Sequence, residues 1–370
     1  MNDEDTSNRL PRIIEKPMGQ KRDLTLDIAK AICIILMVIG HSGCPDYLRR
    51  FIYMFHMPCF FFISGYLLNN KYLTNLKTGL WRKIKSSYYP FVKWSMIFLL
   101  LHNVFAYLHI YDTSYSLKEI SIKFVRILTM TGSEQLLGGF WFLIALCWAS
   151  IATILFFHFT RKSSKSTFAN KLKGVILLLL MASLWNHLPV RLPAQFGEQT
   201  LLATAFYMSG YIYHKTDLKS TYTHIIGPAL FIVPAIVAIY TSLSMDCKGS
   251  IVWLYYVIAI CGTVATIQLS KWLSQTKIAS LLGYIGDKTL YILTFHFLAF
   301  KLVSYVNIEY SHLPLNSLAQ FPVLKTTNSW MWIVYTLVGI FLSLGIWELV
   351  NRIPKFLMAL AHIAMIKSDK

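Results

Sequence analysis

Apolar runs separated by short polar segments recur along the chain, and no polar globular segment interrupts them. Each run is close to the roughly 20 residues that an α-helix needs to cross a bilayer. The pattern predicts an all-α fold, a polytopic membrane helix bundle of about ten transmembrane helices. The expected spans lie at about 26–41, 50–69, 88–108, 139–159, 174–190, 199–214, 223–242, 251–270, 286–306 and 330–350.

One polar segment between these runs has a periodicity of its own. From Ser116 to Leu128, apolar residues recur at helical spacing with charged residues opposite them. This pattern predicts an amphipathic helix that lies on the outer membrane interface. We expect this helix to frame an external opening.

Basic residues mark one side of the predicted bundle. If the N-terminus is cytoplasmic, the loops on its side carry 23 Lys and Arg residues and the opposite loops carry 8. Cytoplasmic loops of membrane proteins are enriched in these residues, so both the N- and C-termini are predicted to be cytoplasmic. The expected organisation is a disordered cytoplasmic tail at 1–22, a membrane domain at 23–352 and a cytoplasmic tail at 353–370.

Composition agrees with a membrane protein. Hydrophobic residues make up 55% of the 370 positions and charged residues 14%, well below the roughly 25% of soluble domains. The net charge of +18 does not indicate a nucleic-acid partner, because Lys and Arg form short clusters between apolar runs, where they contact membrane lipid. The six cysteines form no C-x-x-C pair and have no histidine spacing suited to zinc, so no metal site is expected.

The first apolar run carries three ionisable side chains on one face. At 100° per residue Asp27, Lys30 and His41 align, and the last two lie about 16 Å apart along the helix axis. Ionisable groups inside a span are costly and usually face a cavity or a partner. The stripe indicates a cation toward the cytoplasmic half and an imidazole near the external end. Alternatively, Asp27 and Lys30 only neutralise each other near the headgroups.

The second run places His56 two residues before Pro58, and the small pair Ser64 and Gly65 follows. Pro58 frees a backbone carbonyl, and Gly65 permits a close approach of two helices. Either feature alone is ordinary in membrane packing.

Together with later blocks, these motifs resemble the acyltransferase-3 integral-membrane family, in particular its fucose O-acetylase-like branch. The resemblance covers nearly the whole membrane region, and the order of the blocks is more specific than any one block. The matching blocks are Leu-Asp-Ile-Ala-Lys at 26–30 with Gly-His at 40–41, Phe-His-Met-Pro at 55–58, Phe-Ile-Ser-Gly-Tyr at 62–66, Phe-Trp-Phe-Leu at 140–143, Phe-Tyr-Met-Ser-Gly-Tyr-Ile-Tyr at 206–213, and the segment 281–296.

The resemblance implies ten spans, acyl-coenzyme A on the cytoplasmic side and acyl transfer to a hydroxyl, often on a glycan at the external side. The expected protein is a membrane O-acyltransferase of the bacterial inner membrane. Its donor would be acetyl-CoA, with a longer acyl group such as succinyl as the alternative, and its acceptor a surface glycan or a lipid-linked sugar precursor. Such families commonly have Arg eleven positions before the first-span histidine, where this chain has Lys30. A Lys supplies a phosphate-binding charge without the bidentate fork of Arg.

The expected catalytic residues are His41, Asp27 and His296. His41 is the candidate base, because neutral imidazole can take a hydroxyl proton during attack on a thioester. Asp27 lies about four turns deeper, so its partner is expected to be Lys30 or another helix. His296 could line the same cavity as His41, or be hydrogen-bonded to a neighbouring helix.

The expected donor contacts are Lys30 together with Arg82 and Lys85 of the basic loop before the third run. A basic cluster can hold the phosphates of coenzyme A. The alternative is that this loop serves topology alone and binds anionic lipid.

The expected substrate contacts are His56, Trp141 and Tyr291. Trp141 opens the fourth run from the external side, where aromatic residues usually form an interfacial belt. The family resemblance makes its ring a candidate wall for a sugar.

Two other functions fit the same residues. A transporter or flippase for a lipid-linked saccharide or small solute would also need ionisable groups inside its spans, although no inverted repeat is visible. A purely structural partner in an envelope polysaccharide machine would tolerate replacement of His41 and Lys30 without loss of any turnover.

Overall fold

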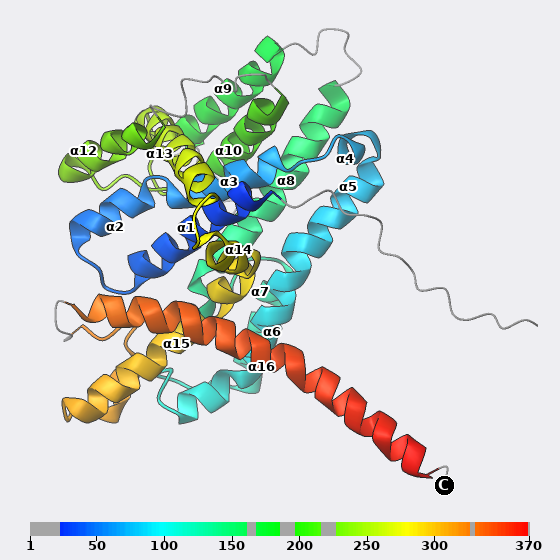
Figure 1. Cartoon of the computed structure of the whole chain (residues 1–370), viewed down its shortest axis with the longest axis vertical. Helices are drawn as coiled ribbons and strands as arrows, with labels where there is room; N and C mark the ends of the chain where they lie inside the picture. The colour runs from blue at the N-terminus through cyan, green and yellow to red at the C-terminus, as the bar shows by residue number, and fades with distance from the viewer. Residues whose placement is uncertain (1–22, 161–167, 186–196, 216–226, 326–329, 369–370) are drawn as a thin grey trace, which may run out of the picture.

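The computed structural model describes residues 23–160, 168–185, 197–215, 227–325 and 330–368, and these residues form helices and loops without a β-strand (Figure 1). The all-α prediction is confirmed for them. The longer helices are α1 (Leu24–His41), α2 (Asp46–Tyr53), α3 (His56–Tyr66), α5 (Leu76–Lys83), α6 (Tyr89–Tyr107), α7 (Leu117–Leu128), α8 (Trp141–Thr160), α9 (Phe168–Leu184), α10 (Glu198–Lys215), α12 (Ile232–Tyr240), α13 (Ile251–Leu273), α14 (Ala279–Asp287), α15 (Thr289–Tyr310) and α16 (Met331–Ser368). Short elements complete the described chain: α4 (Lys71–Thr74), the π-helix η1 (Ile84–Tyr88), and the 3₁₀ turns η2 (Gln135–Phe140), η4 (Pro228–Phe231) and η5 (Leu315–Ala319).

Five helical segments of the described chain are long and apolar enough to cross a membrane, which makes this a multi-pass protein. They are Leu24–His41, Gln135–Thr160, Ile251–Leu273, Thr289–Tyr310 and Met331–Arg352. The total of ten spans and the side on which the termini lie stay predictions.

The second predicted span is not one helix. It is divided into α2 and α3 at Met54 and Phe55, and Phe55 leaves the helical region with φ −141°. Pro58 explains the division, because it has no N–H to donate to the carbonyl of Met54 one turn earlier. The break turns the chain just before His56.

Two other predicted spans have shifted or shortened boundaries. The run at 174–190 corresponds to α9, which begins at Phe168, and the end of that run lies outside the described residues. The run at 223–242 corresponds to the short apolar helix Pro228–Tyr240.

The amphipathic helix predicted from Ser116 onward is confirmed as α7. The Ser116 side chain accepts from the backbone of Glu119, and the Glu119 carboxylate accepts from the Ser116 N–H at 2.8 Å. This reciprocal capping box starts the helix. Ile127 is its one buried side chain, so α7 lies on the surface of the bundle.

The C-terminal helix α16 does not stop at the predicted domain boundary. It contains 38 residues and continues through 352 to Ser368. In Figure 1 its last part extends away from the bundle. The predicted N-terminal tail at 1–22 lies outside the described residues.

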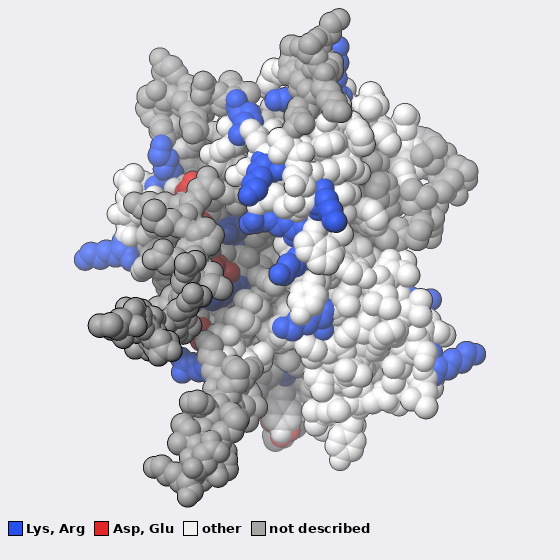
Figure 2. All heavy atoms as spheres, turned by 90° about the vertical axis from the view of Figure 1, so that its right-hand side faces the viewer, with Lys and Arg blue, Asp and Glu red and all other residues white. Residues whose placement is uncertain are grey.

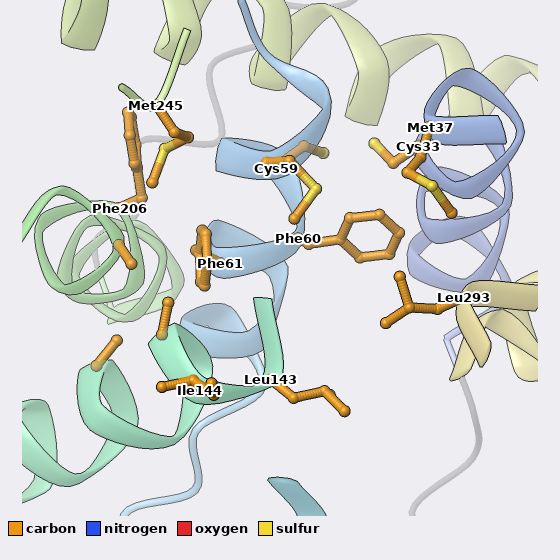
Figure 3. Close-up of a cluster of buried hydrophobic side chains, with 14 of the residues drawn as sticks. Cys33, Met37, Cys59, Phe60, Phe61, Leu143, Ile144, Phe206, Met245 and Leu293 are labelled. Carbon is orange, nitrogen blue, oxygen red and sulfur yellow. The ribbon is translucent and has the colours of Figure 1, made fainter. Parts of the chain in front are cut away.

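Helix α1 is central to the packing, with α3, α13, α14, α15 and α16 against it. Glycines allow the closest approaches. A Cβ atom at Gly286 of α14 would collide with the backbone carbonyl of Asp27, and one at Gly65 of α3 would collide with that of Tyr207 in α10. The close approach predicted at Gly65 is therefore confirmed. Figure 3 shows buried side chains of α1, α3, α8, α10 and α15 that meet in the core.

Candidate active site

Helix α1 carries the predicted polar stripe into the bundle. The side chain of Asp23 accepts a hydrogen bond from the Thr25 N–H and so caps the first turn of α1, whose last residue is His41. Asp27 is buried, while Lys30 and His41 are half-buried. The stripe therefore faces protein or cavity along its whole length.

Asp27 and Lys30 form an ion pair with an Nζ to Oδ1 distance of 2.6 Å. This agrees with the expectation that Lys30 is a partner of Asp27. Asp27 lies 14 positions before His41, or about 21 Å along the axis. It therefore acts on Lys30 and does not orient His41.

A cavity of about 310 Å³, here called the His41 cavity, lies at the C-terminal end of α1. Trp141 and His56, two of the expected substrate contacts, line it. Tyr53 of α2 lines it as well, and more distant parts of the chain complete its polar wall with Gln199, Ser244 and Asp246. The side chain of Gln199 is hydrogen-bonded to that of Asp246.

A smaller cavity of about 180 Å³, the Lys30 cavity, lies further toward the N-terminal end of α1. Lys30, Ser64, Ser86 and Thr289 give it polar groups. Its walls are otherwise apolar and include Ile34, Phe60, Phe142, Leu143, Leu146 and Leu290. One helix thus brings an ammonium to one cavity and an imidazole to the next.

Two buried histidines have a fixed tautomer. Nδ1 of His56 lies 2.8 Å from the carbonyl of Ile52, and Nδ1 of His296 lies 3.1 Å from that of Ile292. A carbonyl only accepts, so each Nδ1 is the donor, and Nε2 of the neutral ring is an acceptor. Within the described part of the chain, Nε2 of His296 is buried and has no hydrogen-bond partner.

His41 is surrounded by aromatic rings. Its ring centroid lies 5.6 Å from that of His296 and 5.0 Å from that of Phe297. The hydroxyl of Tyr53 donates to the Gly40 carbonyl at 3.2 Å and lies 3.4 Å from Nδ1 of His41. Nδ1 of His41 is therefore on the Tyr53 side of the ring.

Two predicted site residues, His296 and Tyr291, do not line the His41 cavity. His296 is fully buried behind His41 and does not line the cavity. Tyr291 lines neither cavity, because its ring stacks on Trp347 of α16 with centroids 3.5 Å apart.

The segment before α6 that was predicted as a basic loop is helical, with Arg82 in α5 and Lys85 in η1, and it lies beside the Lys30 cavity. Lys85 is exposed, and the next residue, Ser86, lines the cavity. The Arg82 guanidinium lies 4.8 Å above the ring of Tyr72 and donates to its hydroxyl. Figure 2, which faces the right-hand side of Figure 1 where α4 and α5 lie, shows Lys and Arg side chains gathered on this face with few acidic ones.

Sequence reasoning missed several residues of this site. Tyr53, Gln199 and Asp246 line the His41 cavity and were not expected. Tyr53 had a sequence signal, since it directly precedes the helix break before His56. The other two sit at loop or helix ends, where periodicity carries no information. Within the described ranges, no group of three His, Cys, Asp or Glu side chains could hold a metal ion.

Comparison with known proteins gives one family and two partial relatives. The acyltransferase-3 family, described as an acyltransferase domain, matches residues 23–348. Nodulation protein NolL of Sinorhizobium fredii is 30% identical over 157 residues, which is 38% of this chain and 38% of NolL. Nodulation protein NolL of Mesorhizobium japonicum is 29% identical over 154 residues, which is 38% of this chain and 36% of that protein. The chain thus aligns with less than half of either relative, and no solved structure matches it.

Proposed function

Because the chain belongs to the acyltransferase-3 family, we propose that this multi-pass protein transfers an acetyl group from acetyl-CoA to a hydroxyl of a surface glycan or lipid-linked sugar precursor. The proposed location is the bacterial inner membrane. One observation carries the proposal: helix α1 supplies Lys30 to one cavity and His41 to the adjoining cavity. The donor then binds at the Lys30 end, and the acceptor meets it at the His41 end.

The length of the donor fits this arrangement. About 12 bonds separate the diphosphate oxygen of coenzyme A from its sulfur, and an extended chain gains about 3.5 Å per three bonds, so the arm spans roughly 14 Å. Lys30 and His41 are about 16 Å apart along α1. A phosphate near Lys30 therefore leaves the thioester near His41. Arg82 and Lys85 are suited to the remaining phosphates.

His41 is the proposed general base. The acceptor oxygen attacks the thioester carbonyl carbon while His41 takes the hydroxyl proton. The C–S bond then breaks, and the departing sulfur takes the proton from the imidazolium. The products are an O-acetyl ester and the free thiol of coenzyme A. No covalent enzyme intermediate is needed when donor and acceptor meet in this way.

His296 is proposed to act through His41 as a positioning residue. Its Nδ1 donates to backbone, so its buried Nε2 can accept an N–H from the neighbouring imidazole. We expect His296→Gln to lower kcat by roughly tenfold to a hundredfold while KM for acetyl-CoA stays unchanged, since no donor contact is lost. A parallel rise in KM would indicate a packing defect instead.

The rim of the His41 cavity suits a sugar acceptor. The Trp141 ring offers a flat apolar face, and the polar groups of Gln199 and Asp246 are suited to ring hydroxyls. His56 presents an acceptor nitrogen in the same cavity. Tyr291 has no substrate contact in this proposal.

The test is transfer from radiolabelled acetyl-CoA by purified protein in vesicles made from native membrane lipids. We expect the wild type to label a glycolipid and His41→Ala to lose 10²-fold or more of the rate. His158→Ala is the matched control, because His158 binds the Leu73 carbonyl and lines neither cavity. Wild-type transfer by His41→Ala would contradict the proposed base.

A transporter or flippase is the second candidate. Two cavities that adjoin along one helix also fit a carrier whose substrate moves between them. In the same vesicles, a carrier would accumulate a saccharide without consuming acetyl-CoA. That result would replace the acyltransferase proposal.

A further inference from the structure

The two cavities meet at three side chains. Among the described residues, Met37, Met57 and Leu293 line both the His41 cavity and the Lys30 cavity, and no other residue does. Their exposed fractions are 2%, 7% and 5%, so they are packed inside the bundle. In Figure 3, Met37 of α1 and Leu293 of α15 approach the same space, with the Phe60 ring of α3 beside it. We call this trio the neck.

Each neck residue shares a helix with a histidine of the site. Met37 is four residues before His41 on α1, Met57 directly follows His56 on α3, and Leu293 is three residues before His296 on α15. The neck is therefore within about one helical turn of the imidazoles. If the thioester sulfur of acetyl-CoA lies in the neck, the thioester carbonyl carbon bonded to it lies in the His41 cavity.

The neck has one fixed side and two adaptable sides. Gly139 of η2 presses against Leu293, since a Cβ atom at Gly139 would lie 2.7 Å from Cδ1 of Leu293. Met37 and Met57 have unbranched side chains that change rotamer easily. Rotamer changes of the two methionines can admit the unbranched end of the coenzyme A arm, but the three side chains leave little room for a second chain beside the arm.

The wall of the His41 cavity is mixed: His41, Tyr53 and His56 supply polar groups, and Trp141 and Met245 supply apolar surface. In the proposed reaction the donor arm occupies the Lys30 cavity on the other side of the neck. Extra methylenes on the acyl group would then lie in the His41 cavity and take up the space that the acceptor hydroxyl needs next to His41.

We infer that Met37, Met57 and Leu293 are specificity-determining residues that restrict the transferred acyl group to two carbons. The inference rests on the proposed function, because it assumes a donor whose arm enters from the Lys30 cavity. Shortening a neck side chain opens apolar space beside the thioester carbonyl. A longer acyl chain can turn back into this space and be buried there.

The experiment measures competition between acetyl-CoA and butyryl-CoA in the vesicle assay. The wild type is expected to prefer acetyl by at least tenfold, and Met37→Ala and Met57→Ala are each expected to raise the butyryl to acetyl ratio roughly tenfold. Met208→Ala is the matched control, because Met208 is as deeply buried but lines neither cavity. Leu293→Val removes one carbon from the fixed side and is expected to raise the ratio by a smaller factor.

The outcomes separate this inference from the function on which it rests. A wild type that transfers neither group refutes the proposed function itself. A wild type that transfers both groups equally overturns the inference even if every alanine variant fails to fold. An active neck variant with an unchanged ratio, or a Met208→Ala variant with the same shift, also overturns it.

Discussion

Three histidines from three different helices, α1, α3 and α15, gather near one end of α1, and their hydrogen bonds determine which ring nitrogen can accept a proton. His56 and His296 each donate Nδ1 to the carbonyl four residues earlier, which leaves Nε2 as an acceptor. His41 makes no such backbone contact in the described structure; its Nδ1 lies toward the Tyr53 hydroxyl instead. Of the three, His41 and His56 line the cavity and can exchange a proton with a substrate there, whereas His296 does not line it. The position of His41 on the same helix face as Lys30 makes it the proposed base.

Lys30 provides a residue-scale test of donor binding. Lys30→Met is expected to raise KM for acetyl-CoA roughly tenfold or more with little change in kcat, because a charge-assisted contact to phosphate is lost. Lys30→Arg keeps the charge and is expected to stay within a few-fold of the wild type. Lys77→Met is the control, because Lys77 lies in the same helix α5 as Arg82 but outside both cavities. If Lys77→Met raises KM for acetyl-CoA as much as Lys30→Met does, the increase comes from the lower overall positive charge of the protein and not from a lost contact with Lys30.

Sequence reasoning identified the residues on α1 better than the residues that face them. The period of one helix showed that Asp27, Lys30 and His41 share a face, and the ion pair follows from a spacing of three. The same period cannot show which other helix packs there. In the sequence the neck residues Met57 and Leu293 are therefore indistinguishable from ordinary apolar positions. The contact of Tyr291 with Trp347 of α16 could not be predicted either.

At the scale of elements, hydropathy predicted the runs but not their interruptions. The first, fourth, eighth, ninth and tenth runs each contain a helix that meets the length and apolarity of a span. The second run is broken because Pro58 removes one backbone donor near the middle of the run, and an average hydropathy over many residues does not register this loss. The broken run is the one that supplies His56 and Met57 to the site.

The contact between α3 and α10 gives an element-scale prediction of stability. Gly65→Ala is expected to destabilise the protein by about 1–3 kcal/mol, because its Cβ would push against the Tyr207 backbone. Thermal unfolding in detergent measures the effect. Gly345→Ala is the matched control, since no atom lies within 4 Å of a Cβ at this position of α16. Equal melting temperatures for the two variants would mean that the helices separate without cost.

The capping box of α7 predicts a pH dependence. Hydrogen bonds from the Ser116 backbone N–H and hydroxyl hold the pKa of Glu119 below its usual range. The stabilisation of the helix start is therefore complete above the ordinary carboxyl pKa of about 4.3 and is lost as the pH falls through the lower folded-state value. Hydrogen-exchange protection of the first turn of α7 should fall in that acidic window. Glu119→Gln should remove this pH dependence, and its persistence would assign it to another group.

At the scale of the whole molecule, helix length and membrane thickness do not match at the C-terminus. With 38 residues, α16 is about 57 Å long, whereas the hydrocarbon core is about 30 Å thick. Part of α16 must therefore lie outside the core or the helix must tilt strongly. The charge count indicated the sides of the loops, but it could not show that this helix continues past its last apolar residues.

Topology is tested by labelling single cysteines in intact cells. With both termini cytoplasmic, a cysteine at Ser368 should react with a membrane-impermeant maleimide only after the cells are permeabilised. A cysteine at Ser121, on the surface helix α7, should react in intact cells because that loop is predicted to be external. Labelling in the opposite sense would invert the orientation and place His41 at the cytoplasmic end of the site.

The neck also has a consequence for the energetics of the host membrane. If the two cavities open to opposite aqueous phases, the three apolar side chains of the neck are the barrier that separates water on the two sides. The membrane potential then falls across the neck instead of across the full bilayer. Apolar constrictions exclude water and ions by dewetting. We expect vesicles with Met37→Ala and Met57→Ala combined to lose an imposed proton gradient faster than wild-type vesicles. Added coenzyme A should restore the seal, because its arm fills the gap that the methionines leave.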